Sequence, residues 1–124
     1  MENPVPGLNI PIDRPSDQAQ ISLSTFTGAL VVSIPNTARL FAEGMVYAIL
    51  GADPENPDWE GAKISAGELQ EDTDQYRQRS DLEVEIPKKV LELFKNQTIS
   101  LRYQTIGESS LTRSSGQISL TIND

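Results

Sequence analysis

The stretch DLEVEIP at residues 81–87 decides the fold class. Leu82, Val84 and Ile86 alternate strictly with charged residues, and this period of two is typical of a β-strand with one buried face. Pro87 ends the pattern because proline has no backbone N–H to donate to a neighbouring strand. The sequence therefore predicts a half-buried strand that stops at a defined residue.

The residues after Pro87 predict a short helix and then a second strand. Residues 88–94 place apolar side chains at helical spacing, so we expect one or two helical turns that end at the turn-forming Asn96. Residues 98–105 then alternate between apolar and polar side chains as far as Gly107. Together these segments form a phrase of strand, proline, amphipathic turn and strand.

An earlier part of the chain repeats this phrase. The matched residues are Leu30, Val32, Ile34 and Pro35 with Leu82, Val84, Ile86 and Pro87, followed by Tyr47 and Gly51 with Tyr103 and Gly107. In the earlier copy residues 45–50 are apolar on both faces, whereas residues 98–105 of the later copy are apolar on one. Because an apolar face must be covered, we expect residues 52–80 to pack over the earlier copy.

Further strands are predicted by weaker patterns. Residues 20–24 and 117–122 alternate, and the latter is expected to form a long hairpin with residues 98–105. Two short strands are expected near residues 62–65 and 74–79, because a structureless loop spanning this whole region is improbable in a compact domain. The Pro-rich start, residues 1–19, is predicted to be a linker or an edge strand.

Composition excludes several classes of function. The 124 residues fit one domain, and they contain no cysteine and no histidine, so Ser-His-Asp triads, Cys-His pairs and the common zinc sites cannot be assembled. The net charge of −8 opposes binding to nucleic acid and to anionic lipid. No apolar run approaches the ~18 residues of a membrane helix, and the first residues show no signal-peptide pattern. We expect a non-enzymatic protein that does not insert into membranes.

The predicted strands resemble bacterial immunoglobulin-like domains, which occur as tandem modules in large surface or secreted proteins. The resemblance covers residues 20–124 and is carried by Leu82-x-Val84-x-Ile86-Pro87, the turn at Asn96, the Tyr103 strand and Ile118-x-Leu120-x-Ile122. It implies an all-β, immunoglobulin-like antiparallel β-sandwich of about seven strands with one or two short helical turns. The chain departs from antibody-type domains because it lacks their cysteine pair.

The resemblance also implies a role and one structural residue. It implies a non-catalytic spacer, adhesion or protein-interaction module within a larger bacterial protein that is surface-located, secreted or particle-associated. Tyr103 would be a corner tyrosine that hydrogen-bonds to backbone. The partner would be a protein or a glycan.

Acidic residues crowd two loops and raise the question of calcium, the one cofactor that the sequence suggests. Asp53, Glu55, Asp58 and Glu60 are the candidate ligands in a proline-rich loop, because hard cations need several converging oxygens. Glu71, Asp72 and Asp74 form a second acidic group. The alternative is a solvated acidic surface, which the common occurrence of such loops favours.

Two aromatic residues are candidates for contact with a ligand or partner. Trp59 could stack on a sugar ring or a partner side chain, or it could fold over residues 45–50 as a lid on the core. Tyr76 could belong to a small recognition patch, or it could be an ordinary strand residue. These alternatives leave two other functions open: a carbohydrate-binding module with a calcium-assisted loop, and a structural subunit that self-associates through the edge near residues 8–12.

Overall fold

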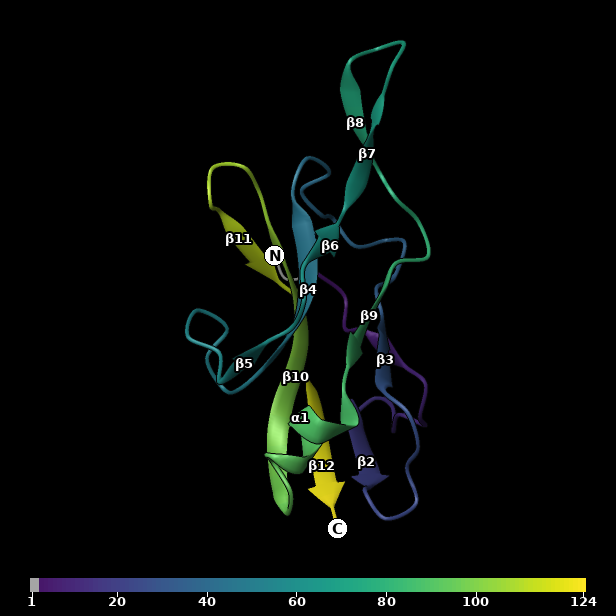
Figure 1. The fold of residues 1–124 in the computed structure, drawn as a ribbon, viewed down its shortest axis with the longest axis vertical. Coiled ribbons are helices and arrows are strands. Elements are labelled where there is room, and N and C mark those ends of the chain that lie inside the picture. The colour runs from purple at the N-terminus through teal and green to yellow at the C-terminus, as the bar shows by residue number, and fades with distance from the viewer. Residues whose placement is uncertain (1–2) are drawn as a thin grey trace.

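The computed structural model describes residues 3–124 and shows an all-β fold with one short helix (Figure 1). The strands are β1 (Gly7–Leu8), β2 (Gln18–Ser22), β3 (Leu30–Ser33), β4 (Met45–Leu50), β5 (Trp59–Glu60), β6 (Ile64–Ser65), β7 (Gly67–Gln70), β8 (Gln75–Gln78), β9 (Glu83–Ile86), β10 (Gln97–Ile106), β11 (Thr112–Ser114) and β12 (Ile118–Asn123). The helix α1 (Lys88–Glu92) lies between β9 and β10. The phrase of strand, proline, helical turn and strand is therefore confirmed at residues 83–106.

The strands form three sheets. The small sheet has the order β1-β3-β9, and the large sheet has the order β2-β12-β10-β4-β5, with β11 added beside β10 and β6 beside β4. Strands β7 and β8 pair only with each other. Strand β2 runs parallel to β12, whereas the other strand pairs are antiparallel. The expected purely antiparallel arrangement is therefore wrong. Most of the chain separates β2 from β12, and a connection of this length allows two neighbouring strands to run parallel.

The core lies between the small and the large sheet. Alternate residues of both sheets point inward, and Leu30, Val32, Val46, Leu50, Ile86, Leu91, Leu101, Tyr103, Ile118, Leu120 and Ile122 are fully buried. Aliphatic side chains dominate this set, as the low aromatic content of the sequence indicates. The buried face of α1, Val90 and Leu91, closes one end of the core.

The two copies of the repeated phrase pair with each other, strand on like strand. Strand β3 pairs with β9 so that Val32 lies opposite Val84, and β4 pairs with β10 so that Ala48 lies opposite Tyr103. Tyr103 therefore points into the core with Ala48, whereas Tyr47 points to the other face of the large sheet. The two tyrosines that the sequence repeat matched therefore face opposite sides of the large sheet, so they are not equivalent positions in the structure.

The weaker sequence patterns also located strands. Strands β6 and β8 fall within the expected residues 62–65 and 74–79, and β12 pairs with β10 as the predicted hairpin. Strand β2 begins two residues earlier than the alternating residues 20–24 indicated. Strands β5, β7 and β11 were not predicted. Each is four residues or shorter, which is too short for a clear period of two.

The N-terminal segment is bound to the body of the fold. The Asn3 side chain donates to the carbonyl of Arg39 at 3.1 Å and accepts from its N–H at 2.8 Å. The Tyr103 hydroxyl donates to the Pro4 carbonyl at 2.6 Å. The expected backbone hydrogen bond of Tyr103 is present, but its partner lies 99 residues earlier in the chain. This tyrosine therefore anchors the start of the chain and does not stabilise a local corner.

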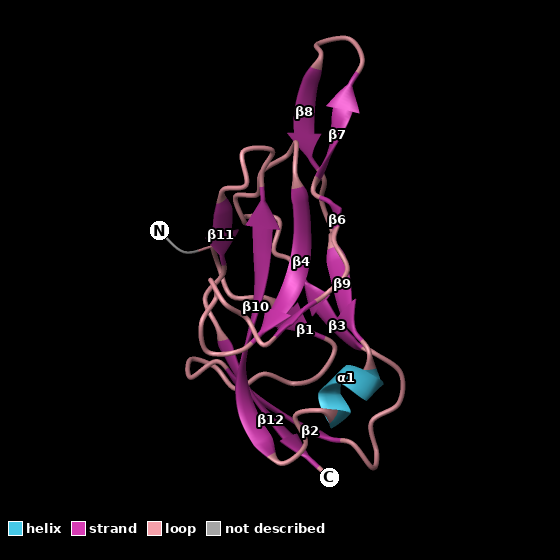
Figure 2. Ribbon diagram, turned by 60° about the vertical axis from the view of Figure 1, so that its left-hand side comes forward, coloured by secondary structure: helices cyan, strands magenta, loops and turns pink. Residues whose placement is uncertain are grey.

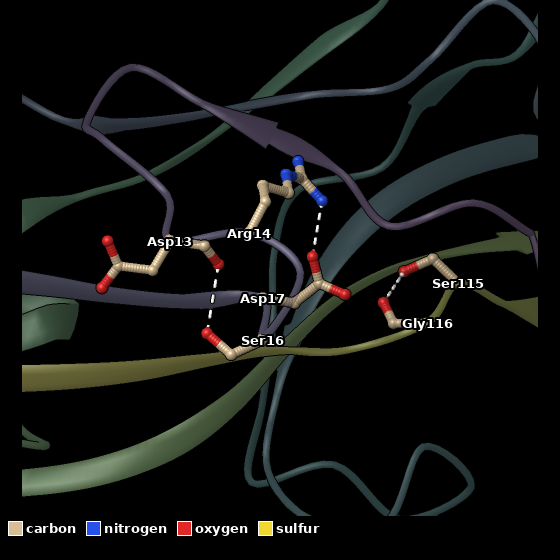
Figure 3. Close-up of polar contacts among 6 residues, drawn as sticks. All are labelled: Asp13, Arg14, Ser16, Asp17, Ser115 and Gly116. Atoms are coloured by element: carbon tan, nitrogen blue, oxygen red, sulfur yellow. Dashed lines mark hydrogen bonds and ion pairs between the residues drawn. The ribbon is translucent and has the colours of Figure 1, made fainter.

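A tight turn then leads from β1 to β2 (Figure 3). Arg14 Nη1 lies 2.6 Å from Asp17 Oδ1, and the Ser16 hydroxyl donates to the Asp13 carbonyl at 3.3 Å. The carbonyl of Asp17 accepts from the N–H of Ser119 in β12 at 2.9 Å. The turn thus places β2 in register beside the last strand of the large sheet.

Candidate functional site

The β7–β8 hairpin extends beyond the rest of the fold, at the end opposite α1 (Figure 2). Its turn, Glu71–Asp74, contains four polar residues, and Asp74 adopts a positive φ of 53°. Aspartate tolerates this conformation better than most residues do. The turn chemistry of the sequence therefore builds a short two-stranded ribbon, whose tip is fully exposed and acidic.

The base of the hairpin is fixed to the body by one side chain. The Gln78 amide donates to the Ala38 carbonyl at 2.8 Å and accepts from the Leu40 N–H at 3.0 Å. A Cβ added at Gly67 would lie 2.4 Å from the carbonyl oxygen of Ala42, so only glycine fits this close approach of two backbones. The hairpin is thus a projecting element with a defined attachment.

An exposed apolar pair occupies one face of the hairpin. Leu69 and Tyr76 lie directly opposite each other, and they are 50% and 48% exposed. The other face carries Glu68 opposite Arg77, a pair of opposite charge. Large apolar side chains that face solvent on a projecting ribbon are the kind of surface that binds a partner.

The outer edges of the hairpin have free backbone groups. The Arg79 N–H donates to the Ala66 carbonyl at 3.0 Å, so these two opposed residues form a hydrogen-bonded pair. Bonded and non-bonded pairs alternate along an antiparallel ladder, so Leu69 and Tyr76 form a non-bonded pair. The N–H and C=O groups of Tyr76 and Gln78 therefore point outward from β8, and those of Leu69 point outward from β7. Because β8 pairs only with β7 among the described strands, its outer edge is open to a further strand.

Three of the predicted calcium ligands lie in the loop between β4 and β5 and the fourth lies in β5, but their side chains do not converge. The Asp53 carboxylate accepts from the N–H of Glu55 at 2.9 Å within its own turn, Asp58 lies against Gly51, and Glu60 lies in β5 opposite Ile49. Within residues 3–124 no three acidic side chains gather into a group that could hold a metal ion. Calcium binding by Asp53, Glu55, Asp58 and Glu60 stays a prediction from the sequence.

The loop after β4 covers the second face of that strand, as its apolar residues predicted. The hydroxyl of Tyr47 donates to the Gln104 side-chain carbonyl, and the Gln104 amide donates to the Pro54 carbonyl at 2.9 Å. The Lys63 ammonium lies 4.7 Å from the centre of the Tyr47 ring. Burial, with a smaller contribution from the Glu60 carboxylate, raises the pKa of Tyr47. This polar cluster is a packed part of the body.

Trp59 packs along the inner face of the large sheet. It lies opposite Leu50 in β5, is partly buried and contacts the main core cluster. Its ring also lies over Gly61, where an added Cβ would be 3.0 Å from the ring edge. The Trp59 ring thus extends the core at the edge of the large sheet. The outer face of β4, which Trp59 could have covered as a lid, is covered by Pro54 and Lys63 instead.

The structure brings one predicted contact residue, Tyr76, into an exposed position and adds residues that the sequence did not single out. Leu69 forms the other half of the apolar pair, and Gln78 fixes the hairpin base. The sequence did contain a signal that could have predicted this pair: Leu69 and Tyr76 lie at equal distances on either side of the acidic turn, as opposed residues of a hairpin do. Trp59 belongs to β5 and does not share a site with Tyr76.

Comparison with known proteins gave no relative. No family model, no curated protein and no solved structure matches the chain. Across residues 3–124, none of the helical structure has the length and apolar character needed to cross a membrane.

Proposed function

We propose that this chain is an immunoglobulin-like, non-catalytic module that serves as a spacer and protein-interaction domain within a larger bacterial surface, secreted or particle-associated protein. The observation that carries the proposal is the strand order. In chain order, β1, β3 and β9 take the places of strands A, B and E, and β4, β10 and β12 take those of C, F and G. In chain order, the β7–β8 hairpin lies between β4 and β9, where such a sandwich has its fourth small-sheet strand, but here the hairpin forms a sheet of its own.

The attachment of both chain ends supports the spacer role. Asn3 forms a bridge to Ser115 and holds Arg39 through two hydrogen bonds. At the other end, β12 pairs with β10 on one side and with β2 on the other. Tension applied between the two ends would be resisted at the same time by hydrogen bonds between paired strands and by buried contacts, which is what a tension-bearing module requires.

The protein-interaction role rests on the hairpin. The body of the fold satisfies its buried side chains, since within residues 3–124 no buried side-chain nitrogen or oxygen lacks a hydrogen-bond partner. On the hairpin, the apolar pair Leu69 and Tyr76 and the open edge of β8 form a surface with unused binding capacity. Projecting elements on a rigid scaffold commonly carry binding functions.

Immunodetection in the source cells tests this proposal. An antibody raised against the purified domain is expected to recognise a protein much larger than 13.6 kDa, and protease added to intact cells is expected to remove the signal. A band at 13.6 kDa that is protected inside intact cells would contradict the proposal.

A further inference from the structure

We propose that a second copy of this chain pairs with the free edge of β8, so that two hairpins form one continuous four-stranded sheet. Unpaired strand edges are templates for strand addition. An isolated two-stranded ribbon is marginally stable, and additional strands stabilise it. A pairing of β8 with β8 around a twofold axis uses the same surface on both copies, as a closed dimer requires. This inference is independent of the larger protein in which the module is proposed to act.

The hydrogen-bonding phase of the hairpin restricts the register of this pairing. New hydrogen bonds can form only between outward-pointing backbone groups, which Tyr76 and Gln78 present. Each of these residues must therefore lie opposite Tyr76 or Gln78 of the second copy. Pairing Tyr76 with Gln78 would place Arg77 directly opposite Arg77 of the second copy. Pairing Gln78 with itself would place Arg77 opposite Arg79. Pairing Tyr76 with Tyr76 avoids both like-charge contacts.

The Tyr76 register creates a continuous apolar row. Leu69 lies opposite Tyr76 within one hairpin, Tyr76 lies opposite its own counterpart, and the second hairpin supplies its Leu69 at the far side. Four apolar side chains thus line one face of the four-stranded sheet. Cross-strand contacts of this kind stabilise paired strands, and they would cover side chains that are about half exposed in one copy.

The charges of the two hairpins are complementary in the same register. Beyond the ends of β8, the same register brings Arg79 toward the turn of the second copy, which contains Asp72, Thr73 and Asp74. Arg77 lies opposite Gln75 of the second copy and keeps Glu68 as its neighbour in its own hairpin. Glu68 offsets the diagonal approach of the two Arg77 side chains. Each basic residue is therefore placed beside a neutral or acidic neighbour.

The two edge strands of the small sheet fit self-pairing less well. Strand β9 presents the outward backbone groups of Glu83 and Glu85, whose side chains are both exposed, so self-pairing would bring carboxylates together. The edge of β1 is only two residues long and is flanked by Pro6. This changes the expectation of self-association near residues 8–12: the structure favours β8 as the associating edge.

The expected dimer is weak. In the Tyr76 register, Gln75, Tyr76 and Arg77 of each β8 strand pair, a contact well below the ~1,000 Å² that marks a stable biological interface. Association is therefore expected only at high protein concentration, or where tethering holds copies close together. Measurements must extend from dilute to millimolar protein.

Paired proline variants test the inference on the full chain. Tyr76→Pro and Leu69→Pro each remove one outward N–H and one of the two apolar side chains, and neither breaks a hydrogen bond within the hairpin. Sedimentation equilibrium is expected to show a concentration-dependent dimer for the unmodified chain and for Leu69→Pro. Tyr76→Pro is expected to weaken dimerisation more than tenfold. A monomer at millimolar concentration in the unmodified chain, or equal losses in the two variants, would overturn the proposal.

A charge exchange tests the register separately from the edge. Arg79→Glu and Thr73→Lys are each expected to weaken dimerisation about tenfold, because each change occurs twice in a twofold interface. The double variant places lysine beside glutamate and is expected to restore the dimer. Circular dichroism checks that every variant is folded. Additive losses in the folded double variant would reject the Tyr76 register.

Discussion

Strands β10 and β8 each carry a tyrosine, yet the two tyrosine side chains differ greatly in burial. Strand β10 has β4 on one edge and β12 on the other, and its Leu101 and Tyr103 are 0% exposed. Strand β8 has a neighbour on one edge only, and its Tyr76 is 48% exposed. The comparison shows that a strand paired on both edges buries its side chains in the scaffold, whereas a strand paired on one edge leaves its side chains and one backbone edge exposed.

The largest expected difference between these strands lies in core truncation. Leu101→Ala removes a fully buried side chain from β10 and is expected to lower the free energy of unfolding by about 2–5 kcal/mol. Leu69→Ala, the matched control in the hairpin, is expected to change it by less than about 0.5 kcal/mol. Chemical denaturation of both variants measures the difference. Similar losses would show that the hairpin is as much a part of the core as β10.

The junction between hairpin and body is expected to have an intermediate effect. Gln78→Ala leaves the Leu40 N–H and the Ala38 carbonyl without their partner in a partly buried position, which is expected to cost about 1–3 kcal/mol. The control is Gln75→Ala on the same strand, where the side chain is exposed. Equal denaturation midpoints for the two variants would exclude Gln78 as the anchor of the hairpin.

Tyr103 is expected to have a smaller effect with a characteristic pH dependence. Tyr103→Phe removes the hydrogen bond to Pro4 and is expected to cost about 1 kcal/mol at neutral pH. Burial raises the pKa of Tyr103 from 10.0 to about 12. Between these values the unfolded state loses its proton first, so stability falls as pH rises above 10. Denaturation at increasing pH should show a steeper loss for the unmodified chain than for Tyr103→Phe, and parallel curves would contradict this role.

Calcium is expected to have the smallest effect. Asp53 is engaged in its own turn and Glu60 is held in β5, and the side chains of the predicted ligands do not converge. We expect the thermal midpoint to be the same in calcium and in chelator. A midpoint that rises with calcium concentration would show that the native state binds the ion, and Asp53→Asn would then be expected to reduce the rise.

The sequence predicted the parts of the fold that depend on local periodicity. Residues 82–86 and 98–105 alternate clearly, so β9 and β10 were located, and the apolar character of residues 45–50 correctly predicted a second covered face. The parallel pairing of β2 with β12 was not predictable, because contacts between distant segments leave no local pattern. The match of Tyr47 with Tyr103 failed for a similar reason, since the face that each residue of β4 and β10 presents depends on how the two strands pair.

The candidate site was predictable only in part for the same reason. Tyr76 was identified as an aromatic residue near basic residues, but its exposure depends on the hairpin leaving the body at Gly67 and Gln78. Leu69 reads as an ordinary core residue in the sequence, because only the register with Tyr76 places it on the exposed face. Trp59 packs against the core, as one of its two predicted alternatives required, and its partial burial follows from pairing with Leu50.

Replacement of the hairpin tests the division between scaffold and binding surface most directly. Residues 69–76 can be exchanged for Asn-Gly, because Glu68 and Arg77 form an opposed pair that a two-residue turn can close. We expect the thermal midpoint to shift by less than about 4 °C and dimerisation at millimolar concentration to disappear. A domain that unfolds without the hairpin would show that the hairpin belongs to the scaffold, and one that still dimerises would show that another surface associates.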